Sequence, residues 1–388
     1  MLANWHGLAY AVRVLKEGEV NVIISRAPMR ISFGGGGTDL EAYYARFGGF
    51  VLSTAINHYC YATASASLDG GIHIHLADAP AGETHSSALP EAAVAMFAGD
   101  GLARRGVSLT LASDVPPGTG LGSSSAMAVA LIHALAGYLR LPMTPAEIAD
   151  RACQLEIERL EMPIGKQDQY ASAYGGLNCI AFARDGAVDV RSLALPQRIR
   201  RGLHARLLLF ATGSRHNSSA ILRRQSEDTR RRPMVAARLH QIKALGLAMR
   251  DTLLTGDLDG FGRLLDRAWQ EKRRLSAAIS NTSIDTWYFA ARSAGALGGK
   301  ITGAGGGGFL LLYAPLEKIA AVREALNGCG LRELPFVFET MGVQTLRSLS
   351  SDIPDAVSAR SYPASRGVHG LRDIEGLRSA LEGGVSHG

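Results

Sequence analysis

Three glycine-rich segments contain the residues whose types and spacing are best suited to chemistry. Their sequences are GGGGTDL at 34–40, VPPGTGLGSSSA at 115–126 and GAGGGG at 303–308. Glycine has no Cβ, so consecutive backbone N–H groups can approach an anion closely. The serine hydroxyls at 123–125 would add further donors in the second segment. This combination indicates the binding of a chain of phosphate groups.

An apolar run follows the second segment, and we expect it to form a helix over about 124–139. The N-terminus of a helix carries unpaired N–H groups and about half a positive charge. A flexible loop in front of a rigid helix is therefore typical of a phosphate-binding site. A plain turn that caps a buried helix would explain one such loop, but three glycine segments in one chain favour binding.

Two common nucleotide-binding motifs do not fit these segments. The second segment lacks the Lys-Ser or Lys-Thr ending of a Walker loop. The third segment has the spacing GxGxxG, but a strand is expected directly after it at 309–313. A dinucleotide-binding fingerprint requires a helix at that point. Both interpretations are therefore excluded.

The elements that must position these segments are helices and strands in mixed order, without the regular alternation of a doubly wound sheet. A turn at 68–71 predicts a hairpin between two strands, and Thr144 is the expected N-cap of a helix that runs to about Leu160. This mixture predicts an α+β fold in two halves that meet near residue 200. The expected strands include 50–66, 72–76, 107–114, 205–212, 309–313 and 335–339.

The chain is expected to divide into two domains with an extension at each end. The predicted parts are an N-terminal extension at 1–20, a first domain at 21–200, a second domain at 201–350 and a C-terminal tail at 351–388. The tail is rich in Ser, Gly and Arg, which favours loose packing.

Composition narrows the class of protein. Hydrophobic residues make up 47% of the 388 residues and charged residues 20%, which is typical of a globular protein. The net charge of +6 suits either nucleic acid or an anionic small substrate, but only 6% of residues are aromatic, which weakens the case for a base-stacking surface. The four cysteines form no CxxC pair, so neither a zinc site nor a disulfide framework is indicated. No membrane span or signal peptide is recognisable, so we expect a cytoplasmic protein.

The glycine segments, with their flanks, resemble the three motifs of the GHMP kinases, a superfamily of small-molecule kinases. The matching stretches are RAPMRISFGGGGTD at 26–39, PPGTGLGSSSA at 116–126 and KITGAGGGGF at 300–309, in the same order as in the family. Within the superfamily, GKQDQYASAYGGLN at 165–178 and TGSRHNSSAILRRQ at 212–225 are similar to bacterial D-glycero-D-manno-heptose 7-phosphate kinases. The resemblance covers roughly residues 20–345.

The resemblance implies a fold and an activity. The fold is the two-domain α+β GHMP kinase fold, in which a ribosomal S5 domain 2-like N-terminal domain precedes a ferredoxin-like C-terminal domain. The implied reaction transfers the γ-phosphoryl group of ATP, with magnesium, to the anomeric (C1) hydroxyl of a heptose 7-phosphate. The implied partner is a small sugar phosphate, and neither nucleic acid nor a membrane is expected.

The resemblance also implies roles for residues in the three motifs. Asp168 would accept or orient the proton of the attacking hydroxyl, while Lys166 or Arg30 would compensate its charge and steady the phosphoryl group. The residues expected to bind the nucleotide are Pro117, Gly118, Gly120, Gly122, Ser123, Ser124, Ser125, Gly303, Gly305 and Gly306.

Magnesium is expected on serine and glutamate oxygens together with phosphate and water. Ser124 or Ser125 and Glu156 fit the family pattern, and Glu158 is the alternative glutamate. Residues two positions apart lie on nearly opposite faces of a helix, so only one of the two glutamates can serve.

The sugar phosphate is expected on the remaining residues of these motifs. Asp39 would accept hydrogen bonds from sugar hydroxyls, and Arg215 would hold the remote phosphate in a two-pronged contact, although a surface arginine is an equally good interpretation. The expected substrate-binding residues are Gly36, Gly37, Thr38, Asp39, Gly175 and Arg215.

Three alternatives stay open at the level of sequence. The chain could be a 1-kinase for another sugar, such as a hexose, a fucose-like sugar or a uronic acid. It could also be a nucleotide or sugar sensor that has lost catalysis. Basic runs at 223–224 and 230–232 allow a nucleic-acid-binding module, although such runs are usually a solvated helix face.

Overall fold

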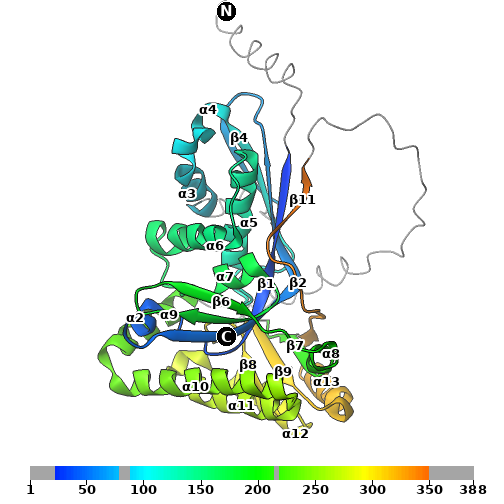
Figure 1. The fold of residues 1–388 in the computed structure, drawn as a ribbon. Coiled ribbons are helices and arrows are strands. Elements are labelled where there is room, and N and C mark those ends of the chain that lie inside the picture. The colour runs from blue at the N-terminus through cyan, green and yellow to red at the C-terminus, as the bar shows by residue number, and fades with distance from the viewer. Residues whose placement is uncertain (1–21, 78–87, 214–217, 349–388) are drawn as a thin grey trace, which may run out of the picture.

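The structure is a computed structural model, and it describes residues 22–77, 88–213 and 218–348 (Figure 1). Its helices and strands form an α+β architecture with two sheets, as the sequence predicts. The strands are β1 (Ile23–Gly34), β2 (Gly49–Ser65), β3 (Ile72–Leu76), β4 (Val107–Ser113), β5 (Leu177–Phe182), β6 (Val188–Ser192), β7 (Leu207–Ala211), β8 (Gly298–Ile301), β9 (Phe309–Tyr313), β10 (Arg332–Glu333) and β11 (Gln344–Ser348). The main helices are α2 (Glu41–Phe47), α3 (Ala88–Met96), α5 (Ser123–Tyr138), α6 (Pro145–Cys153), α7 (Gln167–Tyr174), α8 (Gln197–His204), α9 (Ser218–Arg231), α10 (Pro233–Thr255), α11 (Leu258–Arg273), α12 (Thr282–Ser293) and α13 (Ile319–Gly328).

The first sheet is built on the long strands β1 and β2. Its strand order is β11-β1-β2-β4-β3. In addition, β5 pairs with the first part of β2, and β6 pairs with β5. All pairs are antiparallel except β3 with β4. The helix α5 packs across β1 and β2, and its alanine-rich sequence lets it approach them closely because its residues are small. This fixes the start of α5 relative to β1.

The second sheet has the order β10-β7-β9-β8, and it is buried on both faces. Alternate side chains of a strand point to opposite faces. Leu207 and Leu209 pack in one core with Met29 and Ile31 of β1, whereas Leu208 packs in another core formed with α10, α12 and α13. The first of these cores is shared by both sheets, so the two halves are held in a fixed arrangement.

The helix after the second glycine segment and the cap of the next helix form as the sequence predicts. The helix α5 begins at Ser123, after Gly122 in the left-handed conformation with φ of 75°. Thr144 and Glu147 form a reciprocal capping box at the start of α6, and a π-helical turn at Gln154–Arg159 continues that helix. None of the helices within the described ranges is long and apolar enough to span a membrane.

The predicted hairpin at 68–71 is wrong, because β3 pairs with β4 and not with β2. The strand β4 carries the buried side chains Val107 and Leu109, whereas both histidines of β3 are exposed. The more apolar strand, β4, therefore lies between β2 and β3 in the sheet. The turn at 68–71 changes the direction of the chain but does not join two paired strands.

The predicted strand at 335–339 is also wrong. This segment makes a single bridge, between Phe338 and Ile56, and the strands near it are the short β10 and the later β11. The strand β11 returns to the first sheet and pairs with β1, so the last part of the predicted second domain packs on the first. The proposed segments 1–20 and 351–388 lie outside the described residues.

Candidate active site

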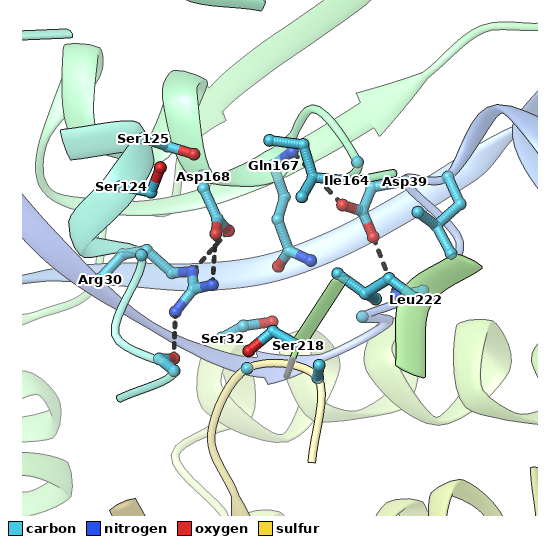
Figure 2. A pocket seen from close by; sticks show the side chains of 18 of the residues that line it. Arg30, Ser32, Asp39, Ser124, Ser125, Ile164, Gln167, Asp168, Ser218 and Leu222 are labelled. Atoms are coloured by element: carbon cyan, nitrogen blue, oxygen red, sulfur yellow. Dashed lines mark hydrogen bonds and ion pairs between the residues drawn. The ribbon is translucent and has the colours of Figure 1, made fainter. Parts of the chain in front are cut away.

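All three glycine segments meet at one pocket, a cavity of about 380 Å³ between the two sheets. Figure 2 shows Asp168 pointing toward Arg30 on one side of the pocket and Asp39 on the other side. Helices α7, α9 and α11 and strand β8 complete the walls. The glycine and serine residues that line the cavity are Ser32, Gly36, Gly37, Gly118, Gly120, Gly122, Ser123, Ser124, Ser125, Gly165, Ser218, Ser219 and Gly303.

The second and third glycine segments run against each other with their backbones in contact. A Cβ on Gly303 would lie 2.5 Å from Gly120 Cα, and a Cβ on Gly120 would lie 2.6 Å from the carbonyl oxygen of Thr302. Both glycines have positive φ, 65° and 81°. Only glycine allows the two backbones to come this close without strain. Gly120 and Gly303 therefore join the two halves of the molecule just before the N-terminus of α5.

Three serines at the start of α5 line the pocket, and the first backbone N–H groups of a helix have no partner within it. Ser124 Oγ donates to Glu156 Oε1 at 2.7 Å, and Gln169 Nε2 donates to Glu156 Oε2 at 2.6 Å. Burial raises the pKa of Glu156 to about 7. Glu158 is exposed on the other face of the helical turn. Of the two candidate glutamates, Glu156 is therefore the one next to the serines.

Arg30 and Asp168 form a two-pronged ion pair. Arg30 Nε donates to Asp168 Oδ1 at 2.7 Å, and Arg30 Nη2 donates to Asp168 Oδ2 at 2.6 Å. Arg30 Nη1 donates to the carbonyl oxygen of Gly120 at 2.7 Å. The guanidinium comes from buried strand β1 and the carboxylate from the first turn of α7, so the pair is held at both ends. Asp168 is thereby fixed beside the second glycine segment.

Asp39 is nearly buried on the opposite side of the cavity. Its Oδ1 accepts from the N–H of Gly37 at 2.8 Å, and its Oδ2 accepts a longer hydrogen bond from the N–H of Gln167 at 3.4 Å. Burial raises the pKa of Asp39, and the negative charge of Asp168 raises it further. The first glycine segment therefore turns a carboxyl group toward the same space as Asp168.

Two lysines in the pocket were missed by the sequence reasoning. Lys300 Nζ donates to the carbonyl oxygen of Ser32 at 2.6 Å, and Lys272 Nζ donates to the carbonyl oxygen of Gly303. Burial lowers the pKa of both ammonium groups, that of Lys272 to about 8. Lys300 is the first residue of the KITGAGGGGF motif and could have been noticed there. Lys272 lies on an amphipathic helix, where spacing alone gives no signal.

Polar groups without partners also line the cavity. Among the described residues, Ser32 Oγ, Gln167 Oε1 and Gln225 Nε2 are buried and have no hydrogen-bond partner. A Cβ on Gly37 would lie 2.4 Å from Gln225 Nε2, so this glycine makes room for the amide. Buried polar groups normally find partners, so these atoms indicate the place of a polar ligand or of water.

Some predicted site residues do not reach the cavity. Lys166 donates to the carbonyl oxygen of Gly186 at 3.0 Å and lies over the ring of Tyr44, so Arg30 and not Lys166 contacts Asp168. Thr38 is buried and donates to the carbonyl oxygens of Gly35 and Phe50. Both side chains hold the backbone around the site.

The remaining predicted positions also serve packing or fall outside the description. Gly175 is the C-cap of α7 and packs against the backbone of Met341. Gly305 packs on Ile279, and the N–H of Gly306 donates to the carbonyl oxygen of Ile279 at 2.8 Å. Pro117 precedes the lining residues of its loop. Arg215 lies outside the described residues.

Comparison with known proteins shows the family. The model of the GHMP kinases N terminal domain matches residues 88–176, and that of the GHMP kinases C terminal domain matches residues 249–330. The D-glycero-alpha-D-manno-heptose 7-phosphate kinase of Campylobacter jejuni is 30% identical over 346 residues, which are 84% of this chain and 100% of the relative.

Solved structures show the same fold. A D-glycero-D-manno-heptose 1-phosphate kinase from Bacteroides thetaiotaomicron has a TM-score of 0.70 and 27% identity, covering 84% of this chain and 99% of that one. The Lactococcus lactis galactokinase complexed with galactose has a TM-score of 0.69 and 17% identity, covering 84% of this chain and 95% of that one. The chain therefore belongs to the GHMP kinase family and is an ATP-dependent kinase.

Proposed function

We propose that this kinase transfers the γ-phosphoryl group of ATP to the anomeric (C1) hydroxyl of a heptose 7-phosphate. The observation that carries the proposal is the Arg30–Asp168 ion pair, which lies beside the loop that precedes α5 in the pocket where all three glycine segments meet. The name of the Campylobacter jejuni relative supports the heptose 7-phosphate, and that of the Bacteroides thetaiotaomicron structure supports a heptose phosphate.

The residues present can carry out each part of the transfer. The sugar hydroxyl oxygen forms a bond to the γ-phosphorus, the bond from that phosphorus to the bridging oxygen of ADP breaks, and ADP leaves. The hydroxyl proton passes to the carboxylate of Asp168, which Arg30 orients. The N–H groups at the start of α5 and the Arg30 guanidinium stabilise the negative charge on the phosphoryl oxygens.

Glu156 and Ser124 offer oxygen atoms of the kind that magnesium binds, and Ser124 lines the cavity whereas Glu156 is buried next to it. Magnesium prefers one or two carboxylates together with phosphate and water, and the described residues hold no cluster of three or more metal-binding side chains that would suit a different metal. Glu156 and Ser124 would hold the ion beside the phosphates. The ion would supply charge neutralisation of the phosphate chain.

The charge and polarity of the pocket support a phosphorylated sugar. Lys300 reaches the cavity, and among the described residues no carboxylate lies within ion-pair distance of its ammonium group. The unpartnered oxygen of Gln167 and nitrogen of Gln225 offer an acceptor and a donor to hydroxyl groups. An acceptor with several hydroxyls and a negative charge would satisfy both features.

Product analysis with a panel of acceptors tests the proposal. ADP release is measured with heptose 7-phosphate, unphosphorylated heptose, galactose, fucose and glucuronic acid, and the product is examined by ¹H–³¹P NMR. We expect the highest kcat/KM for heptose 7-phosphate and a new phosphate coupled to the anomeric proton. A higher kcat/KM for an unphosphorylated sugar, or a phosphate on another oxygen, would refute this substrate and position. The Asp168→Asn variant serves as the control for contaminating kinases.

A further inference from the structure

Lys272 is the basic residue of α11 that points into the pocket. It lies one residue before the end of the helix and lines the cavity from the second half of the molecule, whereas Arg30 lines it from the first. The two basic residues that follow it on the chain point elsewhere and are paired. Arg273 Nη2 lies 2.6 Å from Asp285 Oδ2, and Arg274 Nη1 lies 2.9 Å from Glu271 Oε1.

The ammonium group of Lys272 has donors to spare. It has three N–H bonds, and the interaction found among the described residues is one hydrogen bond to the carbonyl oxygen of Gly303. No carboxylate of the described residues lies within ion-pair distance of it. Lys272 is partly buried, and a cation withdrawn from water without a carboxylate partner is costly unless an anionic ligand compensates it.

Arg30 and Lys272 each donate to a backbone carbonyl where the second and third glycine segments meet. Arg30 donates to the carbonyl oxygen of Gly120, and Lys272 donates to that of Gly303. Gly120 and Gly303 are in backbone contact. Both cations are therefore held at the point where the loop before α5 meets the third glycine segment, which is where the end of a phosphate chain bound on α5 would lie.

From this placement we propose that Lys272 is a catalytic residue that donates to a non-bridging oxygen of the transferred phosphoryl group, while Arg30 serves the same group from the other half of the molecule. This inference rests on the proposed function only in requiring ATP as the phosphoryl donor. Lys272 keeps its proton during the step. The bond from the sugar oxygen to phosphorus forms, the bond to the ADP oxygen breaks, and the hydroxyl proton goes to Asp168.

The proposal gives a pH dependence because only the charged lysine can donate in this way. The pKa of Lys272 is lowered to about 8, chiefly by burial and in part by the positive charge of Arg30, while the carboxylate of Asp39 opposes the shift. Lys300 on β8 is the other cation facing this space, and burial lowers its pKa as well. The free enzyme should therefore lose kcat/KM as the pH rises through about 8.

Three variants test the proposal. Lys272→Met removes the charge, Lys272→Arg keeps it at all working pH values, and Lys243→Met is the matched control. Lys243 also donates to backbone carbonyls, those of Phe47 and Gly48, but lies outside the cavity. The measurements are kcat and KM for the acceptor, calorimetric Kd for ADP and for a non-hydrolysable ATP analogue, and the pH profile of kcat/KM.

We expect Lys272→Met to lower kcat by about 100-fold or more, because one well-placed donor at a transition-state oxygen has this effect. It should weaken the ATP analogue more than ADP, since ADP lacks the γ-phosphate. The Lys272→Arg variant should retain more kcat than Lys272→Met and should lose the fall above pH 8. Lys243→Met should behave as wild type.

Several results would overturn the role of Lys272. These are a kcat within threefold of wild type in Lys272→Met, an equal loss of affinity for ADP and the ATP analogue, or a loss confined to the KM of a phosphorylated acceptor. If Lys272→Met does not fold, as judged by thermal unfolding, the pH profile of Lys272→Arg decides. The comparison of ADP with the ATP analogue needs no acceptor, so a wrong sugar assignment would leave this test intact.

Discussion

At the scale of single residues, the site depends on the two-pronged contact between Arg30 and Asp168. Two charge-assisted hydrogen bonds fix both the direction and the distance of the carboxylate. The third contact of Arg30, to the carbonyl oxygen of Gly120, ties the pair to the second glycine segment. A change at Asp168 should therefore affect chemistry much more than nucleotide binding.

Replacing Asp168 by Asn should lower kcat by about 10²–10⁴-fold, the usual contribution of a positioned general base. The Kd for ADP should change by less than about threefold, which calorimetry would show. The exposed Asp189, which pairs with Arg191, provides a control that should be neutral as Asn. A kcat close to wild type in Asp168→Asn would contradict the role of this carboxylate.

A second prediction concerns the magnesium dependence of variants at the two glutamates of the turn after α6. Glu156 is buried against Ser124, whereas Glu158 is exposed two residues later. Glu156→Gln should raise the magnesium concentration at half-maximal velocity by about 10-fold or more, as loss of a metal-binding group commonly does. Glu158→Gln should leave it unchanged. Identical magnesium titrations for the two variants would rule out Glu156 as a ligand.

At the scale of elements, the contact between the second and third glycine segments decides the shape of the pocket. Gly118 and Gly120 have similar positive φ angles, 79° and 81°, but different surroundings. A Cβ on Gly118 would meet nothing within 4 Å, whereas one on Gly120 would lie 2.6 Å from the Thr302 carbonyl oxygen. Alanine variants of these two glycines therefore distinguish the cost of a positive φ from the cost of a clash with the backbone of Thr302.

Gly118→Ala should destabilise the ligand-free protein by about 1–2 kcal/mol, because the left-handed conformation is unfavourable for alanine. Gly120→Ala should cost about 1–3 kcal/mol more, since the backbone of Thr302 must move away. Urea unfolding of both variants without nucleotide would measure the difference. Equal free energies of unfolding for the two variants would mean that the second and third glycine segments are not in tight contact at Gly120.

The sequence predicts local elements better than their partners. The start of α5 and the capping box at Thr144 follow from local chemistry, which needs no knowledge of the rest of the chain. The pairing of β3 depends on which strand lies next to β2, and that strand is β4. The turn at 68–71 carries no information about β4. The segment 335–339 has strand-like residues but makes only one bridge.

The same limit applies to the site. Asp168 and Arg30 lie in recognisable motifs, and the structure places them in contact. Lys166 lies in the same motif as Asp168, but its side chain leaves the pocket for Gly186. Lys272 reaches the pocket from a helix about 100 residues further along the chain, and the packing of α11 against α10 and β8 brings it there. Motif spacing cannot show such a contact.

At the scale of the whole molecule, the pocket depends on the fixed arrangement of the two halves. The core that contains Met29 and Ile31 of β1 also contains Leu209 of β7 and Phe309 of β9. The hydrogen bond from Lys300 to Ser32 links the second sheet to the first beside the cavity. The strand β11 adds a second link, because it pairs with Ile23 through Arg26 of β1.

Two truncations test the link through β11. A chain that ends at Ser348 keeps β11, and a chain that ends at Gly342 loses it. We expect the shorter chain to be less stable by about 1–3 kcal/mol, because several backbone hydrogen bonds of β1 are lost and each contributes about 0.5–1.5 kcal/mol. At low temperature its kcat should stay close to that of the longer chain. Equal unfolding midpoints would show that β11 contributes nothing to the first sheet.

The most direct test of the whole account is a crystal structure with a non-hydrolysable ATP analogue and heptose 7-phosphate. We expect the phosphate chain at the start of α5 between Gly120 and Gly303, and the anomeric oxygen within about 3 Å of a carboxylate oxygen of Asp168, the reach of a general base. A nucleotide bound elsewhere, or a sugar whose anomeric oxygen points away from Asp168, would contradict it.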